Sequence, residues 1–172
     1  HSNGTERIAE AAENIEADFF IDIQGDEPLL NPDHIDYVVA EHQKHPEWDI
    51  VLPSLPIDKP ETQHICKVTH DANFRILYLS RAVIPQPFKH RPDFYLKHLS
   101  IISFTSESLR HYSTLKPSSL ERVEGIELLR AIENGMVVGT VLLEGDSFSV
   151  DIKQDFDKAI ERMAIDEMRK QY

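Results

Sequence analysis

Cysteine, long apolar runs and positive charge are all scarce in this sequence, and each shortage excludes a class of protein. Cys66 is the only cysteine, which excludes a disulfide framework and a cysteine-based zinc cluster and fits a reducing compartment. No apolar run approaches the roughly 20 residues that a membrane-spanning helix needs. Lys and Arg number 18 against 30 Asp and Glu, a formal net charge of −12, which disfavours binding to nucleic acid or anionic lipid. We therefore expect a cytoplasmic protein with no nucleic-acid or membrane partner.

The 172 residues carry enough apolar side chains for one folded domain, residues 1–172. Apolar residues make up 41% of the sequence, with eight Phe and five Tyr. A chain of this length should bury roughly 70% of the surface that it exposes when unfolded. Short apolar runs alternate with segments of helical period, which is typical of an α/β sheet with helices on both faces.

Capping residues and apolar runs predict the individual elements. Asn3 and Glu6 have the spacing of a capping box at the start of a first helix, and Asn31-Pro32-Asp33 begins a second. Asp71-Ala72-Asn73 joins two strands, 67–69 and 75–79, in a hairpin that adds an antiparallel portion. The other expected strands are 19–23, 50–57 with proline interruptions, 99–104 and 136–143; the other expected helices are 106–112, 118–134 and 156–168; residues 80–96 are expected to be irregular.

Two acidic residues follow expected strands, where ligands gather in open α/β sheets. Asp26 lies in the loop Gln24-Gly25-Asp26-Glu27-Pro28 after the strand 19–23, and Asp151 lies at a strand end just before the last expected helix. Carboxylate oxygens are ligands that Mg²⁺ prefers, so the two together could hold a Mg²⁺ that also grips substrate phosphates. The alternatives are an ordinary polar turn around Asp26 and a helix-start acid at Asp151.

Seven blocks follow one another along nearly the whole chain: His1-Ser2-Asn3-Gly4-Thr5-Glu6-Arg7, Phe20-Ile21-Asp22-Ile23-Gln24-Gly25-Asp26-Glu27-Pro28, Leu77-Tyr78-Leu79-Ser80-Arg81-Ala82-Val83-Ile84-Pro85, Lys97-His98-Leu99, Pro117-Ser118-Ser119-Leu120-Glu121, Glu127-Leu128-Leu129-Arg130 and Val150-Asp151. In this order they resemble consecutive blocks of the 3-deoxy-D-manno-octulosonate (Kdo) cytidylyltransferases, also called CMP-Kdo synthetases. One such block would be weak evidence, but seven in register are specific.

The resemblance implies a Rossmann-like nucleotidyltransferase sheet of the GT-A type, flanked by helices, with a small antiparallel sheet through which a homodimer forms. It implies transfer of CMP from CTP to the anomeric 2-hydroxyl of a 3-deoxy-ulosonic acid, with release of pyrophosphate, for lipopolysaccharide or capsule biosynthesis. The reaction is an in-line attack on the α-phosphorus. Catalysis would therefore rest on positioning and on charge neutralisation by a Mg²⁺ cofactor.

The same resemblance implies roles for individual residues. Asp26 and Asp151 would be the metal ligands and, with Arg81, the catalytic residues. Arg81 suits the sugar carboxylate because its planar fork can bind it bidentately. The nucleotide contacts would be Ser2, Asn3, Gly4, Thr5, Arg7 and Gln24, with backbone groups at a helix start as donors; the sugar contacts would be Gln24, Arg81, His98 and Glu127.

Three of these residues have structural alternatives when they are considered without the resemblance. Arg81 could be a surface ion-pair partner, and His98 a polar side chain at a sheet edge. Glu127 could belong, with Glu121 and Glu124, to an acidic helix face that is simply solvated.

Departures from the family pattern leave two further alternatives open. Ile102 stands where the family usually has Tyr, and Leu128 where it usually has Gln, so the substrate could be another sugar acid. The Gly- and Arg-containing triphosphate loop of the family has no counterpart here. We therefore expect the chain to cover the carboxyl-terminal two thirds of the pattern, without its amino-terminal strands, and a non-catalytic sugar-acid binding fragment remains an alternative.

Overall fold

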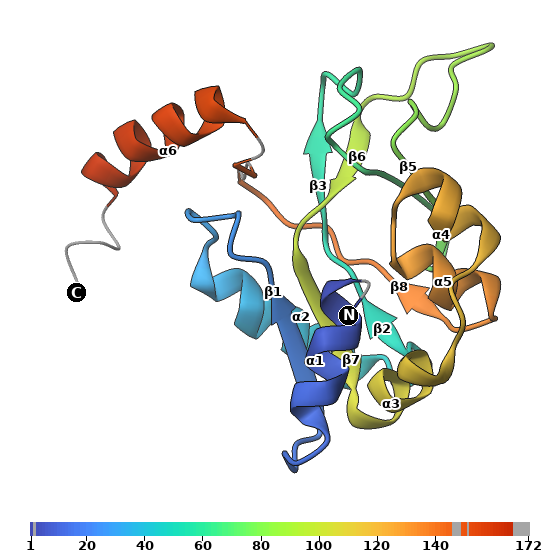
Figure 1. Cartoon of the computed structure of the whole chain (residues 1–172). Helices are drawn as coiled ribbons and strands as arrows, with labels where there is room; N and C mark the ends of the chain where they lie inside the picture. Colours follow the sequence, from blue (N-terminus) through green and yellow to red (C-terminus); the bar gives the residue numbers. More distant parts are fainter. Residues whose placement is uncertain (2, 146–148, 151, 167–172) are drawn as a thin grey trace.

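Two four-stranded sheets lie end to end in the computed structural model, which describes residues 1, 3–145, 149–150 and 152–166 (Figure 1). The first sheet has the strand order β1-β7-β2-β8, and only its β2–β8 pair is parallel. The second has the order β3-β6-β4-β5 and is antiparallel throughout. The strands are β1 Phe19–Ile23, β2 Ile50–Val51, β3 Ser54–Ile57, β4 Lys67–His70, β5 Ile76–Ser80, β6 Tyr95–His98, β7 Ile101–Thr105 and β8 Val138–Gly139.

The chain passes between the sheets twice, at Pro53 and at Leu99. The two crossings lie side by side, because the backbone N–H of Leu99 donates to the carbonyl of Pro53 at 2.9 Å. The expected strand 50–57 is therefore two strands in different sheets. The expectation of irregular structure over 80–96 was wrong at its end, where β6 begins at Tyr95. Local sequence gave no sign of β6, since its pairing partners β3 and β4 lie more than 25 residues away.

Helices cover both faces of the first sheet, as expected. On one face, α1 (Gly4–Ala12) and α3 (Ser106–Thr114) pack on a core that contains Phe104 and Tyr112. On the other, α2 (Pro32–Lys44) places Val38 against Trp48 and Ile101. The expected caps are confirmed: the side chain of Asn3 accepts from the N–H of Glu6 at 2.8 Å, and that of Asn31 accepts from Asp33 at 3.0 Å.

The expected helix over 118–134 is broken into α4 (Ser119–Glu124) and α5 (Leu128–Glu133). Gly125 separates them with a φ of 64°, a left-handed conformation that glycine adopts without steric cost. The apolar period continues across the break, so the pattern alone hid it. The interruption turns Ile126 and Glu127 toward the junction of the two sheets.

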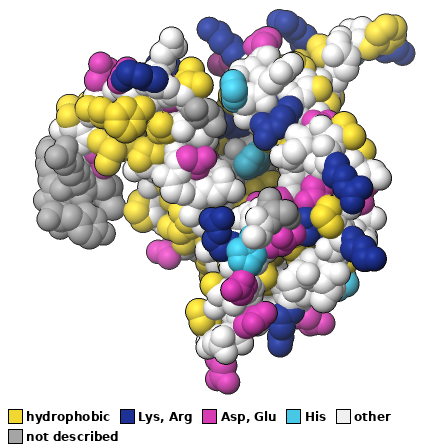
Figure 2. All heavy atoms as spheres, in the orientation of Figure 1, with side chains coloured by type: hydrophobic (Ala, Val, Ile, Leu, Met, Phe, Trp, Pro, Cys, Tyr) yellow, Lys and Arg dark blue, Asp and Glu magenta, His cyan; other side chains and the backbone are white. Residues whose placement is uncertain are grey.

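The carboxyl-terminal part differs from expectation in length more than in kind. The expected strand 136–143 is reduced to β8, and the backbone beyond it reaches the second sheet through a bridge between Ser54 and Leu142. The last helix, α6 (Lys153–Ile165), stands away from the sheets (Figure 1). Its hydrophobic side chains form an exposed patch in Figure 2, with Phe156, Ile160 and Ile165 among them. Among the helices in the described ranges, none is both long and apolar enough to cross a membrane.

Candidate active site at the junction of the two sheets

A two-lobed cleft lies where the ends of β1, β5 and β6 meet the α4–α5 connection. The larger lobe, about 660 Å³, is lined mainly by charged and polar side chains and is called the charged lobe. The smaller, about 280 Å³, is lined by Leu52, Leu79, Ile102, Ile126 and Leu128 among others and is called the apolar lobe. Four residues line both lobes: Gln24, Cys66, Arg81 and His98.

Most of the site residues expected from the sequence meet at this cleft. Asp26 lines the charged lobe, Asn3 and Glu127 line the apolar lobe, and Gln24, Arg81 and His98 line both. The two aliphatic departures, Ile102 and Leu128, also line the apolar lobe.

Three expected nucleotide residues that the structure describes do not line the cleft, and two further expected residues lie outside the described ranges. Gly4 and Thr5 lie beside it at the start of α1, next to Asp22 and Glu127. Arg7 is exposed on α1 and lines neither lobe. Asp151 lies outside the described residues, as does Ser2 of the nucleotide block.

The loop that carries Asp26 is joined by two hydrogen bonds to the crossing between β6 and β7. Ser100 accepts from the N–H of Gln24 at 3.3 Å and donates its own N–H to the Glu27 carboxylate at 3.1 Å. The N–H of Val150 donates to the Asp26 carbonyl at 2.8 Å. The segment next to Asp151 is thus joined to the Asp26 loop.

The charged lobe has donors that suit a hard divalent cation. Ser149 and Asp155 line it together with Asp26, and oxygen ligands of this kind, completed by substrate phosphates, are those that Mg²⁺ takes. Within the described ranges, no group of three or more potential ligands is gathered to hold a metal by protein side chains alone. Asp26, Ser149 and Asp155 thus offer oxygen atoms of the type that Mg²⁺ binds.

Arg81 is held by backbone carbonyls rather than by a carboxylate side chain. Its Nε donates to Glu124 O at 3.0 Å, Nη1 donates to Gln63 O and His64 O at 3.2 and 3.3 Å, and Nη2 donates to Gly125 O at 3.4 Å. The Glu124 carboxylate accepts from the backbone N–H of Arg81 at 3.0 Å, and no carboxylate among the described residues accepts a hydrogen bond from the Arg81 guanidinium. The guanidinium therefore keeps its positive charge available to an anion in the cleft.

His98 and Cys66 are both neutral at neutral pH for the same reason. Burial lowers the pKa of His98, and its Nδ1 has no hydrogen-bond partner among the described residues. Burial raises the pKa of the Cys66 thiol to about 12. Cys66 is thus a small core side chain rather than a nucleophile, as expected, whereas His98 offers a neutral imidazole to the cleft.

Glu127 is not on a solvated helix face. One of its carboxylate oxygens accepts from the backbone N–H of Thr5 at 3.1 Å, which joins a residue expected at the sugar to one expected at the nucleotide. Burial raises its pKa, and the neighbouring charge of Asp22 raises it further. Asp22 is 4% exposed, and its Oδ2 lacks a partner in the described structure.

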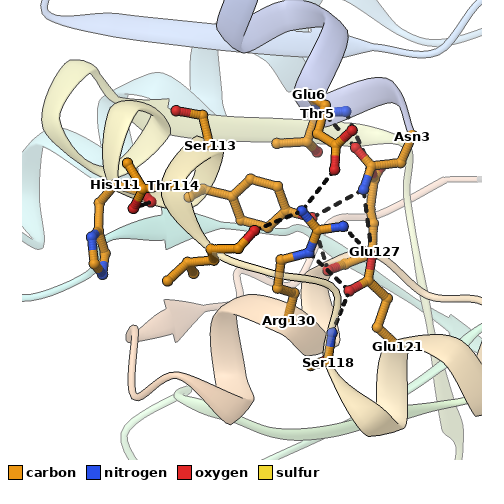
Figure 3. Close-up of polar contacts among 12 residues, drawn as sticks. Asn3, Thr5, Glu6, His111, Ser113, Thr114, Ser118, Glu121, Glu127 and Arg130 are labelled. Atoms are coloured by element: carbon orange, nitrogen blue, oxygen red, sulfur yellow. Dashed lines mark hydrogen bonds and ion pairs between the residues drawn. The ribbon is translucent and has the colours of Figure 1, made fainter. Parts of the chain in front are cut away.

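Arg130 ties the start of α1 to α4 and α5 (Figure 3). Its side chain is 1% exposed; it binds Glu121 bidentately at 2.8 and 2.6 Å, and Glu6 at 2.8 Å. The guanidinium also lies 5.0 Å from the ring centre of Tyr112, whose hydroxyl donates to Glu127 O at 3.1 Å. Asn3 donates to that hydroxyl at 3.3 Å. Arg130, Glu6, Glu121, Tyr112 and Asn3 are called the Arg130 cluster. The cluster holds together the residues that flank the apolar lobe.

Sequence reasoning missed Asp22, Arg130 and Lys67, a buried lysine described below. Asp22 and Arg130 lie within the blocks that carry the family resemblance, but their charges look like ordinary polar positions in the local pattern. Lys67 lies between two buried apolar neighbours, Cys66 and Val68, which was the one local sign of burial. The alternative of a simply solvated acidic helix face at Glu121, Glu124 and Glu127 was also wrong. Glu124 accepts hydrogen bonds from Tyr78, Ser80 and Arg81.

A larger hollow, about 1280 Å³, lies between α1 and α3. Its lining includes Glu6, Glu10, Glu13 and Glu16 but none of the expected site residues that the structure describes. An acidic lining repels a polyanionic nucleotide, so this hollow is a poor candidate for the active site.

Comparisons with known proteins agree with the geometry. Residues 1–143 match the cytidylyltransferase family. The chain is 38% identical over 160 residues to the 3-deoxy-manno-octulosonate cytidylyltransferase of Chlorobium limicola, covering 90% of this chain and 65% of that protein. It is 34% identical over 169 residues to the enzyme of the same name from Acidobacterium capsulatum, covering 96% and 68%. The chain thus spans about two thirds of the length of these relatives.

A solved structure has the same fold. CMP:2-keto-3-deoxy-manno-octonic acid synthetase complexed with CTP superposes with a TM-score of 0.90 and 29% sequence identity, covering 95% of this chain and 69% of that one. The α/β architecture with a small antiparallel sheet is confirmed by this likeness. On these grounds the chain belongs to the 3-deoxy-manno-octulosonate cytidylyltransferase family.

Proposed function

We propose that the protein transfers CMP from CTP to the anomeric 2-hydroxyl of Kdo or a closely related 3-deoxy-ulosonic acid, and releases pyrophosphate. The observation that carries this proposal is the cleft itself. Residues from the start of α1, the end of β1, the end of β5, β6 and the α4–α5 connection line it together, and each was expected at the substrates. The relatives' names and the CTP in the neighbouring structure support the same reaction.

The two substrates would occupy different lobes. The charged lobe, with Asp26, Lys59, Arg81 and Lys97 on its walls, suits the phosphates and the carboxylate. Arg81 would bind the sugar carboxylate, since none of its guanidinium donors is bonded to a carboxylate among the described residues. Gln24 and His98 line both lobes and would bind hydroxyl groups at the junction, the latter as a neutral imidazole.

Asp26 and Asp151 would hold the Mg²⁺ cofactor, together with the phosphates of CTP. When bound, the ion supplies positive charge that neutralises the α-phosphate and the leaving pyrophosphate. The protein's own share is positioning. Asn3, Gly4 and Thr5 would orient the nucleoside, and Arg81 would aim the 2-hydroxyl at phosphorus.

The lining of the apolar lobe favours a second candidate substrate. Ile102 and Leu128 offer no hydrogen bond at positions on that lobe, and an aliphatic lining discriminates between substrates by only about 1–3 kcal/mol. A sugar acid altered at a distal hydroxyl, by deoxygenation or amino substitution, would therefore compete with Kdo. We also propose a cytoplasmic homodimer that forms through the second sheet.

The test is an assay of the protein as its organism produces it, with CTP, Mg²⁺ and either Kdo or a distally modified analogue. We expect CMP-sugar and pyrophosphate in equal amounts, loss of turnover on addition of EDTA, and values of kcat/KM for the two acids within about 10³-fold. Asp26→Asn should lower kcat on the order of 10³-fold, equivalent to several kcal/mol of transition-state stabilisation, and should leave the melting temperature nearly unchanged because Asp26 is exposed.

The matched control is Asp36→Asn, an exposed aspartate on α2 outside the cleft, which should not change kcat. An Asp26→Asn enzyme that keeps most of its activity at low Mg²⁺ would contradict the metal assignment. A wild-type protein that makes no CMP-sugar from either acid would contradict the proposed function. A preference for Kdo above about 10³-fold would exclude the second substrate.

A further inference from the structure

Four consecutive backbone carbonyls in the loop before β4 each accept a hydrogen bond from a cation. Lys67 Nζ donates to Thr62 O at 2.9 Å and to Ile65 O at 2.6 Å. Arg81 Nη1 donates to the two carbonyls between them, those of Gln63 at 3.2 Å and His64 at 3.3 Å. Loop 62–65 is thus held from both ends by Lys67 and in the middle by Arg81.

The same loop forms part of the candidate active site. Thr62, His64 and Ile65 line the charged lobe beside Arg81. Any shift of the loop would change the shape of the lobe at the place where the sugar carboxylate is expected.

Lys67 is completely buried, at 0% exposed. Its third ammonium donor goes to the carbonyl of Arg81 at 2.6 Å, so each of its protons has a carbonyl acceptor. Burial lowers the pKa of Lys67, because the ammonium loses its hydration in this site. An apolar side chain would fill the same volume without that loss of hydration, but it would leave three carbonyls without their donor.

Arg81 cannot bind a carboxylate bidentately without losing one of its hydrogen bonds to backbone carbonyls. A guanidinium has five N–H donors, and four of them already donate to Glu124, Gln63, His64 and Gly125. A bidentate pair needs two parallel N–H groups. When an acid binds bidentately, at least one of these four carbonyls must therefore give up its place on Arg81 to a carboxylate oxygen. Two of the four, those of Gln63 and His64, belong to loop 62–65.

We propose that Lys67 is a positioning residue for the sugar acid. It keeps loop 62–65 and the backbone of Arg81 in place while the Arg81 guanidinium exchanges one of its carbonyl acceptors for the substrate carboxylate. This inference rests on the proposed function and on Arg81 as the carboxylate contact. Lys67 does not touch the substrate; it acts through the loop and through Arg81.

Steady-state kinetics of Lys67→Gln separate positioning from a purely structural role. We expect the KM for the sugar acid to rise tenfold or more, and the KM for CTP to stay within about twofold of the wild type. A purely structural role would lower the active fraction, and hence the apparent kcat, with both KM values unchanged. The matched control is Lys116→Met, which removes one charge from an exposed lysine away from the cleft and should change neither KM.

A double-mutant cycle tests whether Lys67 acts through Arg81. Arg81→Gln alone should raise the KM for the acid, and adding Lys67→Gln should raise it little more, because the guanidinium that Lys67 positions is already absent. Additive effects of the two substitutions would overturn the proposal. So would a folded Lys67→Gln enzyme with an unchanged KM for the acid.

Crystal structures test the hold on the loop without any assay of activity, and they do so even if Lys67→Gln does not fold. In Arg81→Gln, the carbonyls of Thr62 and Ile65 should stay within hydrogen-bond distance of Lys67 Nζ, because these two contacts do not involve the guanidinium. In the wild type, the same two contacts should persist when Kdo is bound. Loss of either contact in either structure would overturn the proposal, whereas a wild-type protein without turnover would count against the proposed function alone.

Discussion

At the scale of one residue, Asp22 is a buried carboxyl group whose ionised form is unfavourable in the fold. It lies in the middle of β1, opposite Ile102 of β7, and its Oδ2 has no partner in the part of the chain described. A Cβ on Gly4 would lie 3.6 Å from Asp22 Oδ2 and 3.8 Å from Glu127 Oε1, so both carboxyl groups lie against the start of α1. Burial raises the pKa of each, and their mutual repulsion adds to the effect on Glu127.

This raised pKa predicts a pH dependence of stability with a definite sign. Asp22 holds its proton more tightly in the folded state than in the unfolded chain, where the pKa of its carboxyl group is near 3.8. The free energy of unfolding must therefore fall as pH rises above about 4 and through the raised pKa. Asp22→Asn removes the titration, so we expect it to stabilise the protein by on the order of 1 kcal/mol at pH 8.

Urea unfolding of wild type and Asp22→Asn between pH 4 and pH 8 measures this difference. The gain should shrink as the pH falls toward 3.8 and below it, where Asp22 becomes protonated in the unfolded chain as well. A constant difference between Asp22→Asn and wild type at all pH values would show that Asp22 is ionised in the fold.

At the scale of elements, the Arg130 cluster connects helices that the sequence keeps more than 100 residues apart. Arg130 on α5 reaches Glu6 on α1 and Glu121 on α4. It is nearly inaccessible to water, so its ion pairs are screened less than surface pairs. These contacts consequently join the start of α1 to the α4–α5 connection, and both flank the apolar lobe.

Removal of this cation should be costly, because two carboxylates would lose their counter-charge. Breaking a buried ion pair from one side typically destabilises a protein by about 3–5 kcal/mol. We expect Arg130→Met to fall in that range by urea unfolding. Arg110→Met on α3, an exposed arginine whose Nε donates to Ser106 O at 3.1 Å, should cost less than about 1 kcal/mol. Equal effects of the two substitutions would refute a role of the cluster in holding the helices.

At the scale of the whole molecule, the second sheet leaves an apolar side chain exposed. Leu77 is 56% exposed on β5, which is an edge strand of that sheet. Exposed apolar side chains on an edge strand favour association with another chain. This supports the proposed homodimer through the second sheet.

The proposed dimer should weaken when Leu77 becomes charged. Full burial of a leucine contributes about 1.5–3 kcal/mol, so Leu77→Glu should raise the dimer dissociation constant at least about tenfold. Analytical ultracentrifugation over a range of concentrations measures it. Val123→Glu, at an 83% exposed position on α4 outside the second sheet, is the matched control and should leave the constant unchanged. A dimer insensitive to Leu77→Glu would place the interface elsewhere.

Local sequence signals were sufficient for the elements whose ends are set by nearby residues. Asn3 and Asn31 cap α1 and α2 with their own side chains, and Asp71 accepts from the N–H groups of Asn73 and Arg75 in the hairpin turn. These interactions span four residues or fewer, so they can be predicted from the sequence itself. Family resemblance likewise supplied Gln24, Asp26, Arg81, His98 and Glu127 as site residues, although it could not place them relative to one another.

Tertiary structure alone decided what depends on partners distant in the chain. The split of 50–57 between two sheets, and β6 itself, follow from strand pairing across tens of residues. The acceptors of Arg130 on Glu6, and of Lys67 on Arg81, are 124 and 14 residues away. The local sequence predicts that a charged side chain is exposed to solvent. Such a side chain can be buried only where hydrogen-bond acceptors surround it, and here those acceptors come from distant parts of the chain. For that reason the sequence predicted candidate site residues such as Arg81, whereas it did not predict Lys67 and Arg130, which bind their neighbours through buried contacts.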